Sequence, residues 1–229
     1  MIAEEILLHI GELKGLKNEE QMVVDYLLDK LLYIIFTLWD DVVLGGGTCI
    51  NRFYGGRRFS RDLDIYSEGY IDVSLVVDEL EREGFSVELS KGITRVGFRP
   101  YYFTIEMWRE PVIVKLDIIS STPREFIKTK YESYYPDIPP IDINILTVVD
   151  LLREKIRALL SEARWKIADV YDIYFICRKY RLDWRKFCDP DKVDEIKKRA
   201  EYLIKRDWKV LEDTLLEEIS QDEILRYFK

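Results

Sequence analysis

Two aspartates separated by one residue could bind a metal ion. Asp62 and Asp64 lie in the run Asp-Leu-Asp-Ile, which predicts a short strand. Side chains two residues apart in a strand point to the same face, about 6.6–7 Å apart, so Leu63 and Ile65 point to the opposite face. Parallel carboxylates repel each other unless a cation lies between them, and Mg²⁺ prefers such oxygen ligands and also binds phosphates. The pair by itself also fits a solvated strand face.

A third acid lies in a more apolar segment. The alternation of residues 112–119 predicts a strand with Val112, Val114 and Leu116 on one face and Asp117 on the other. A carboxylate within such an apolar run needs a partner or a metal, although a charge on an edge strand is the alternative. The segment therefore predicts that Asp117 has either a cationic partner or a metal ion beside it.

A run of three glycines precedes the acids and could bind a phosphate. Gly46 and Gly47 follow a short apolar strand, predicted over 42–44, and precede Thr48 and a short helix. Glycines accept positive φ and let backbone N–H groups approach a phosphate, and the helix adds the positive end of its dipole. Thr48 would cap this helix or bond a phosphate oxygen. The spacing is not that of a Walker loop or a dinucleotide-binding fingerprint, and a simple strand-to-helix turn is the alternative.

A basic loop separates the glycines from the acids. Arg57, Arg58 and Arg61 lie in this loop, and Ser60 stands two residues before Asp62. Arginine offers bidentate hydrogen bonds to phosphates, so we expect Arg58 to offset phosphate charge and Ser60 to orient Asp62. A solvated loop that balances the charge of the two acids is the alternative.

These segments together resemble a known family. Gly-Gly-Thr, then Arg-Phe-Ser-x-Asp-Leu-Asp, then a later hydrophobic-Asp-hydrophobic strand resemble the DNA polymerase β-like nucleotidyltransferase superfamily. Within it, the chain is most similar to the AbiEii/MenT-type toxin nucleotidyltransferases. Two helical segments, 152–159 and 168–173, match the family's Glu-Lys-x-x-Ala-Leu and Arg-Asp-x-Tyr-Asp patterns. One departure is Ala168, which stands where the family has an arginine, and Lys166 is the candidate replacement.

The resemblance implies a fold and a set of site residues. It implies an α/β (α+β) nucleotidyltransferase fold, in which a mixed sheet flanked by helices precedes a C-terminal helical bundle. It implies Mg²⁺ as cofactor, with two ions and with Mn²⁺ as the alternative metal. The expected metal ligands are Asp62, Asp64 and Asp117. The expected catalytic residues are these three together with Lys155 and Asp169. The expected nucleotide-binding residues are Gly46, Gly47, Thr48, Arg58, Ser60 and Asp172.

The resemblance also implies an activity and partners. The expected reaction moves a nucleoside monophosphate from an NTP to an acceptor hydroxyl, and the toxin branch implies an RNA 3′ end, such as that of tRNA, and a cognate antitoxin. The acceptor could instead be a small molecule or a protein side chain. From another class, an NTP-binding module without turnover stays open because of Ala168, as does a plain interaction protein.

Composition limits the other functions. The net charge of −8 argues against a general nucleic-acid coat protein, so an RNA target requires a local basic surface, for which residues 57–61 and 197–199 are candidates. His9 is the single histidine, which disfavours a zinc hydrolase or a serine–histidine triad. The three scattered cysteines suggest reduced thiols in the cytoplasm. No apolar run predicts a membrane span, and no signal peptide is recognisable.

The expected domain organisation has three parts: a catalytic domain over 1–125, a proline-rich linker over 126–146 and a helical domain over 147–229 that contributes to the cleft. Asn18 is the expected N-cap of a long helix. The expected helices of the catalytic domain cover 2–14, 18–38 and 71–84, and its later strands cover about 85–90, 93–99, 101–108 and 112–119.

Overall fold

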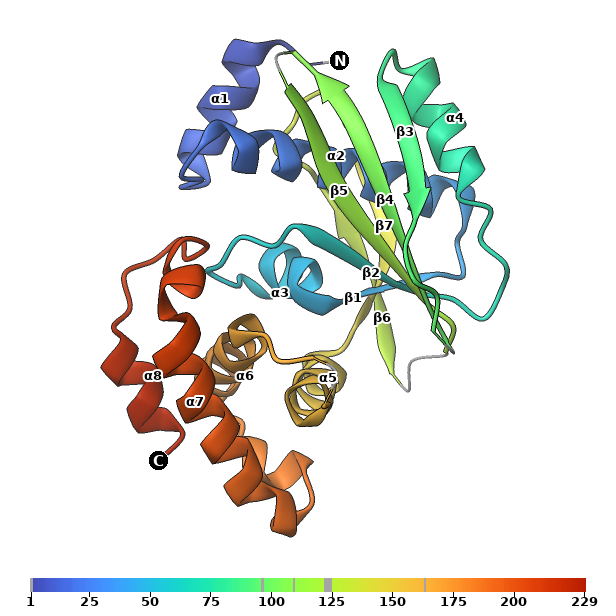
Figure 1. The fold of residues 1–229 in the computed structure, drawn as a ribbon. Helices are drawn as coiled ribbons and strands as arrows, with labels where there is room; N and C mark the ends of the chain where they lie inside the picture. Colours follow the sequence, from blue (N-terminus) through green and yellow to red (C-terminus); the bar gives the residue numbers. More distant parts are fainter. Residues whose placement is uncertain (1, 96, 109, 122–124, 163) are drawn as a thin grey trace. The chain divides into compact units, whose positions relative to one another are not determined.

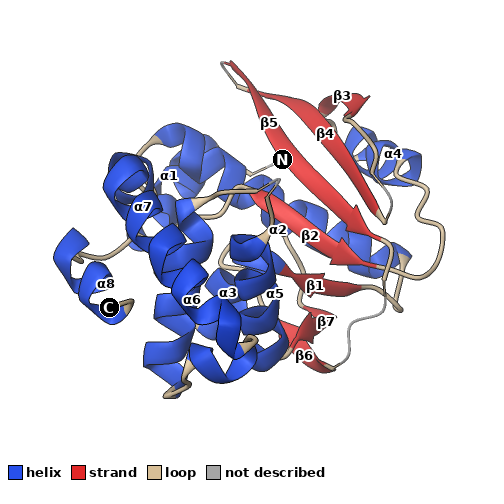
Figure 2. Ribbon diagram, turned by 60° about the horizontal axis from the view of Figure 1, so that its bottom comes forward, coloured by secondary structure: helices blue, strands red, loops and turns tan. Residues whose placement is uncertain are grey.

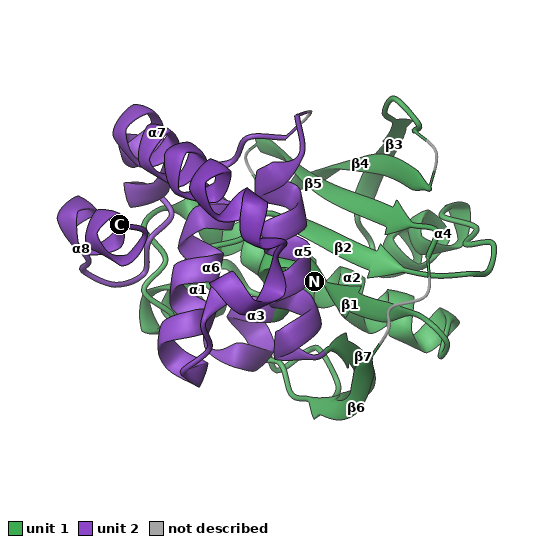
Figure 3. Cartoon of the chain, turned by 90° about the horizontal axis from the view of Figure 1, so that it is seen from below, with its two compact units in different colours: residues 1–49, 59–146 green, residues 50–58, 147–229 purple. Residues whose placement is uncertain are grey.

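The chain forms two compact units (Figure 3). The computed structural model describes residues 2–95, 97–108, 110–121, 125–162 and 164–229. Unit 1 comprises residues 1–49 and 59–146, and unit 2 comprises residues 50–58 and 147–229. Helix α3 (Gly46–Tyr54) therefore begins in unit 1 and ends in unit 2.

Unit 1 is built on a mixed sheet, for which the described residues provide seven strands in the order β3-β4-β5-β2-β1-β7-β6 (Figures 1 and 2). Strand β2 is parallel to β5 and β1 is parallel to β7, whereas the other neighbouring strands are antiparallel. The strands are β1 (Val43–Gly45), β2 (Asp62–Tyr66), β3 (Ser86–Lys91), β4 (Phe98–Met107), β5 (Glu110–Ile119), β6 (Phe126–Tyr131) and β7 (Ile141–Leu146).

Helices of unit 1 cover one face of this sheet. Helix α2 (Glu19–Leu38) packs on β5 and β7, α4 (Ser74–Arg82) packs on β3 and on α2, and α1 (Glu4–Leu13) packs on α2 (Figure 1). The expected N-cap is present, because Asn18 Oδ1 accepts a hydrogen bond from the backbone N–H of Gln21 at 2.9 Å. Apolar side chains of alternate strand positions, such as those of Leu63 and Leu116, are buried.

Unit 2 is helical, as the sequence predicts from Thr147 onward. Its helices are α5 (Val148–Leu160), α6 (Ile167–Tyr180), α7 (Val193–Glu212) and α8 (Gln221–Tyr227), with 3₁₀ turns at Trp184–Phe187 and Pro190–Lys192. Helix α5 packs on α6 and α7, and α8 packs on α6 and α7. Among the described residues, no helix is both long enough and apolar enough to cross a membrane.

The expected linker over 126–146 is wrong. This segment contains β6 and β7, and β7 pairs in parallel with β1 through Leu44 and Ile145. The prolines suggested irregular chain, but they fall between the two strands. Ile143 and Ile145 alternate with polar residues and are buried. The segment therefore belongs to the core of unit 1.

The expected strands 93–99 and 101–108 are also corrected, because a single strand, β4, covers residues 98–107. Pro100 lies inside it. The carbonyl of Pro100 accepts from Gly92 N at 2.9 Å, so the side of the residue that lacks an N–H faces the position where β3 has just ended. Pro100 cannot donate a hydrogen bond in return, but the pairing of β3 with β4 ends at Lys91 and Tyr101, so proline stands just beyond that ladder, where it is tolerated. Val96, within the expected strand 93–99, lies outside the described residues.

Candidate active site

Two neighbouring strands bring the three acids of unit 1 to one face of the sheet. In the parallel pairing of β2 with β5, Asp64 is opposite Asp117 and Asp62 is opposite Lys115. Residues opposite each other in adjacent strands point to the same face, so the three carboxylates face away from Leu63, which is fully buried on the other side. This placement agrees with the arrangement expected from the sequence.

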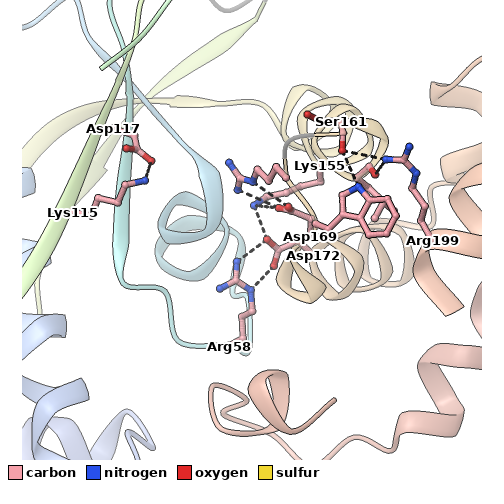
Figure 4. Close-up of polar contacts among 11 residues, drawn as sticks. Arg58, Lys115, Asp117, Lys155, Ser161, Asp169, Asp172 and Arg199 are labelled. Atoms are coloured by element: carbon pink, nitrogen blue, oxygen red, sulfur yellow. Dashed lines mark hydrogen bonds and ion pairs between the residues drawn. The ribbon is translucent and has the colours of Figure 1, made fainter. Parts of the chain in front are cut away.

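Asp117 has an unusual environment for a carboxylate. It is 2% exposed. Lys115 Nζ donates a hydrogen bond to its Oδ2 at 2.5 Å (Figure 4). Its Oδ1 is buried and has no hydrogen-bond partner among the described residues. Burial raises the pKa of Asp117 to about 6; repulsion from Asp64 and Asp62 adds to this, and Lys115 opposes it. The buried oxygen is therefore an acceptor that a cation would satisfy.

Gly46 brings the backbone close to these acids. It is the first residue of α3, its φ is +67°, and a Cβ at this position would lie 1.7 Å from Asp64 Oδ2. Only glycine fits, because both the backbone conformation and the space exclude a side chain. The N-terminal turn of α3, which includes Gly47, therefore begins beside Asp64, and the N–H groups and dipole of a helix N-terminus favour an anion.

Thr48 does not cap α3, which corrects one of the two roles expected for it. It lies inside the first turn of the helix and is 1% exposed. Its hydroxyl donates to the backbone carbonyl of Asp62 at 2.6 Å. The side chain thus fixes the beginning of α3 to the beginning of β2.

The three acids fit a hard divalent cation by their chemistry. They supply carboxylate oxygens on a common face, and in the part of the chain that the structure describes Asp117 Oδ1 accepts no hydrogen bond. In the described part of the chain, no group of three or more His, Cys, Asp or Glu side chains is already gathered in a metal-binding arrangement. The ammonium of Lys115 is instead the cation that contacts Asp117.

A second charged cluster lies within unit 2 (Figure 4). Arg58 Nε and Nη2 each donate to Asp172 at 2.8 Å. Lys155 Nζ lies 2.8 Å from Asp172 Oδ2 and 3.1 Å from Asp169 Oδ1. All four residues are buried. Burial alone would raise the pKa of Asp172, but Arg58 and Lys155 lower it to about 2, so this carboxylate is ionised.

This cluster decides between some of the alternatives that the sequence left open. Arg58 is buried, which excludes the solvated loop given as its alternative, and Lys155 is buried as well. Asp169 and Asp172 both contact the ammonium of Lys155.

Arg164 is a member of this cluster that the sequence analysis missed. Its Nε lies 3.3 Å from Asp169 Oδ2, so it supplies a cation near the place where Ala168 replaces the family arginine. Lys166, the expected replacement, is exposed at the N-cap position of α6. Only the path of the chain between α5 and α6 brings Arg164 back to Asp169, and no sequence spacing indicates it.

The two other arginines of the basic loop have protein partners. Arg57 Nη2 donates to the carbonyl of Leu216 at 3.0 Å in unit 2, and Arg61 forms an ion pair with Glu20 in unit 1. Ser60 is half-buried in the loop before β2, and its role stays a prediction.

The guanidinium group of Arg199, on α7, packs against the end of α5. Its Nη1 donates to the carbonyls of Leu159 and Ser161 at 3.0 and 3.1 Å (Figure 4). Its guanidinium carbon lies 5.0 Å from the ring centroid of Trp165.

Comparison with known proteins identifies the family. The family model described as "Nucleotidyl transferase AbiEii toxin, Type IV TA system" matches residues 30–229. The chain belongs to the AbiEii nucleotidyltransferase toxin family. Its enzyme class is therefore nucleotidyltransferase, and the family and enzyme class expected from the sequence are confirmed. For the AbiEii family in general, an NTP substrate, a divalent metal and an antitoxin partner are implied.

Solved structures share the fold. A proposed nucleotidyltransferase from H. pylori is 18% identical, with a TM-score of 0.64 over 93% of this chain and 92% of that one. JHP933 from Helicobacter pylori is 17% identical, with a TM-score of 0.61 over 92% of this chain and 89% of that one. The expected fold class is confirmed. No curated protein matches the chain.

Proposed function

We propose that the protein transfers a nucleoside monophosphate from a Mg²⁺-bound NTP to the hydroxyl of an RNA 3′ end, with Asp62, Asp64 and Asp117 as the metal ligands. The observation that carries this proposal is the pairing of Asp64 with Asp117, whose buried Oδ1 lacks a hydrogen-bond partner among the described residues, beside the glycine that begins α3. Mn²⁺ would fit the same oxygen ligands.

The chain's own groups have distinct roles in this proposal. A bound metal would lower the pKa of the attacking hydroxyl and offset the charge of the triphosphate. Gly46 and Gly47 present backbone N–H groups to phosphate oxygens at the N-terminus of α3. Asp117 accepts the proton of the acceptor hydroxyl, and a bound metal would keep its carboxylate ionised for this role.

The roles expected for the residues of unit 2 stay predictions. Lys155 and Asp169 are proposed as catalytic residues, and Arg58 and Asp172 as nucleotide-binding residues. Each has an oppositely charged partner inside unit 2, so a phosphate that reached Lys155 would share its ammonium with two carboxylates. The same sharing would apply to Arg58.

Two exposed aromatic side chains in unit 2, each beside a guanidinium group, favour RNA as the acceptor. Trp165 and Tyr202 are 41% and 48% exposed, and their rings meet edge to face at 5.7 Å. Arg199 lies over Trp165 and Arg206 lies over Tyr202, each at 5.0 Å from the ring centroid. Aromatic faces next to guanidinium groups bind unstacked bases of single-stranded RNA. Both guanidinium groups also form ion pairs, Arg199 with Glu195 and Arg206 with Asp207, so base stacking rather than net positive charge is what this surface offers RNA.

Labelling tests the proposal directly. The protein is incubated with total RNA, Mg²⁺ and each α-labelled NTP in turn, and we expect label in an RNA band. Asp64→Asn should lower the labelling about 100-fold or more, because a metal ligand is lost, without lowering the thermal unfolding midpoint of the metal-free protein. Asp142→Asn is the matched control, since Asp142 is an exposed strand residue of the same sheet paired with Lys128.

Three results would contradict the proposal. Full labelling by Asp64→Asn would remove the metal role of this residue. Label that enters protein or a small molecule, with none in RNA, would remove RNA as the acceptor. A thermal unfolding midpoint that MgCl₂ raises equally in the native protein and in Asp64→Asn would place metal binding elsewhere.

A further inference from the structure

The order of strands in unit 1 places the glycine turn on one side of the acids and strands β4 and β3 on the other. Nucleotidyl transfer requires the attacking and leaving oxygens to lie roughly in line, on opposite sides of the phosphorus. The glycine turn lies at the end of β1, and the acids lie on β2 and β5, so the sheet order continues from β5 to β4 and β3 on the side away from the glycines. If the triphosphate binds at Gly46, the acceptor must approach from the β4 side. This step rests on the proposed function.

Two aromatic side chains lie on that side of the acids. Tyr102 of β4 is opposite Lys115, and Phe98 of β4 is opposite Ile119, in the antiparallel pairing of β4 with β5. Because opposite residues share a face, both rings project from the face that carries Asp117. Both are half-buried, and Lys115 Nζ lies 5.5 Å from the ring centroid of Phe98.

The ring of Tyr102 is held in place by the chain around it. A Cβ at Gly92 would lie 2.8 Å from Tyr102 Cε2 and 2.9 Å from Pro100 Cγ, so the backbone after β3 packs directly against both side chains. On β4, Pro100 is the residue opposite Asp117, and Tyr102 follows two positions later on the same face, opposite Lys115. A ring fixed in this way loses little freedom when a flat ligand stacks on it.

We propose that Tyr102, with Phe98 and Lys115 beside it, binds the terminal base of the RNA acceptor by stacking. An aromatic ring accepts any base, which suits the end of a nucleic acid, whereas a sugar-like acceptor would need several hydrogen-bonding groups. The ammonium of Lys115 offsets the repulsion that three carboxylates exert on an approaching phosphodiester backbone. The site thus selects a nucleoside terminus as the acceptor.

The test separates acceptor binding from donor binding. In the labelling assay, Tyr102→Ala should raise the KM for RNA about 10-fold and leave the KM for the NTP within about twofold. Tyr102→Phe keeps the ring and should behave as the native protein. Tyr101→Ala is the matched control, because this half-buried neighbour points to the opposite face of β4. Thermal unfolding midpoints of the variants confirm that each is folded.

A binding experiment gives a second measurement that requires no turnover. A short RNA with 2-aminopurine as its 3′-terminal base is added to the inactive Asp64→Asn protein, and stacking on Tyr102 should quench its fluorescence. A double variant that carries both Asp64→Asn and Tyr102→Ala should lose most of the quenching and bind the RNA about 10-fold more weakly.

The outcomes distinguish this inference from the proposed function. An unchanged KM for RNA and unchanged quenching in Tyr102→Ala would overturn the inference while labelling of RNA by the native protein stands. A raised KM for the NTP alone would assign Tyr102 to the donor base and overturn it as well. If the native protein labels no RNA, the proposed function fails, and the quenching experiment still decides whether Tyr102 stacks on a terminal base.

Discussion

At the scale of single residues, the site of unit 1 depends on atoms that approach closely. Gly46 has a positive φ, and a Cβ added to it would clash with Asp64 Oδ2. Thr48, two residues later, uses its hydroxyl to bind the backbone at Asp62. The beginning of α3 is therefore fixed against β2 by two contacts, one of which tolerates no side chain.

Alanine substitutions at Gly46 and Gly15 distinguish a steric clash with Asp64 from the strain of a positive φ alone. Gly46→Ala should abolish detectable nucleotidyl transfer and lower the free energy of unfolding by about 1–3 kcal/mol, because the methyl group displaces the Asp64 carboxylate at a strained φ. Labelling of RNA and denaturant unfolding measure the two effects. Gly15→Ala is the control: its φ is +73° and nothing lies within 4 Å of the added Cβ. It should lose only about 1 kcal/mol and keep full activity. Equal activity of the two variants would contradict the role of Gly46.

At the scale of elements, buried charges join three segments of unit 2. Arg58 comes from the loop after α3, Lys155 from α5, and Asp169 and Asp172 from α6. The charges compensate one another, and removing one leaves its partners buried without compensation. The pairing therefore fixes how α5, α6 and the loop meet inside unit 2.

Asp172→Asn tests this pairing through its pH dependence. The pKa of Asp172 is lowered to about 2, so the carboxylate adds stability above the unfolded-state pKa of about 3.9, and this stability disappears as the pH falls toward 2. We expect the variant to lose about 3–5 kcal/mol of unfolding free energy at pH 7 and less below pH 4. Urea unfolding at several pH values measures this. Glu201→Gln, at an exposed ion pair with Lys205, should change stability by less than about 1 kcal/mol. A pH-independent loss would contradict the prediction.

At the scale of the whole molecule, unit 2 is made from two separate parts of the chain. Residues 50–58 contribute the end of α3 and a loop to a helical unit that otherwise begins at residue 147. Inside unit 2, this short part is held by Lys179 Nζ on the carbonyl of Tyr54 at 2.7 Å and by the backbone N–H of Leu216 on the carbonyl of Arg57 at 2.9 Å. The Arg58 pairing with Asp172 adds to these contacts.

Cutting the chain between Leu146 and Thr147 tests whether residues 50–58 are packed into unit 2. With a protease site inserted there, we expect the cleaved protein to elute as one species, because residues 50–58 remain packed in unit 2. Size-exclusion chromatography under native conditions and in concentrated urea compares the associated and separated fragments. Asp172→Asn should make the cleaved fragments separate at a lower urea concentration. Fragments that separate on cleavage without urea would contradict the prediction.

The sequence by itself determined the features that depend on neighbouring residues. Alternation in β2 and β5 gave the common direction of Asp62 and Asp64 and the opposite direction of Leu63, and Asn18 marked the beginning of α2. These are local consequences of strand and helix geometry. The motifs in their order also identified the AbiEii family, which the match over residues 30–229 confirms.

Only the tertiary structure decided which distant segments meet. It paired Arg58 with Asp172, brought Arg164 to Asp169, and turned the expected linker over 126–146 into β6 and β7. Composition misled there because prolines between two strands resemble prolines in a linker. Strand register and the partners of buried charges are set by packing across the whole fold, since each buried carboxylate or arginine must find a counter-charge wherever the chain brings one.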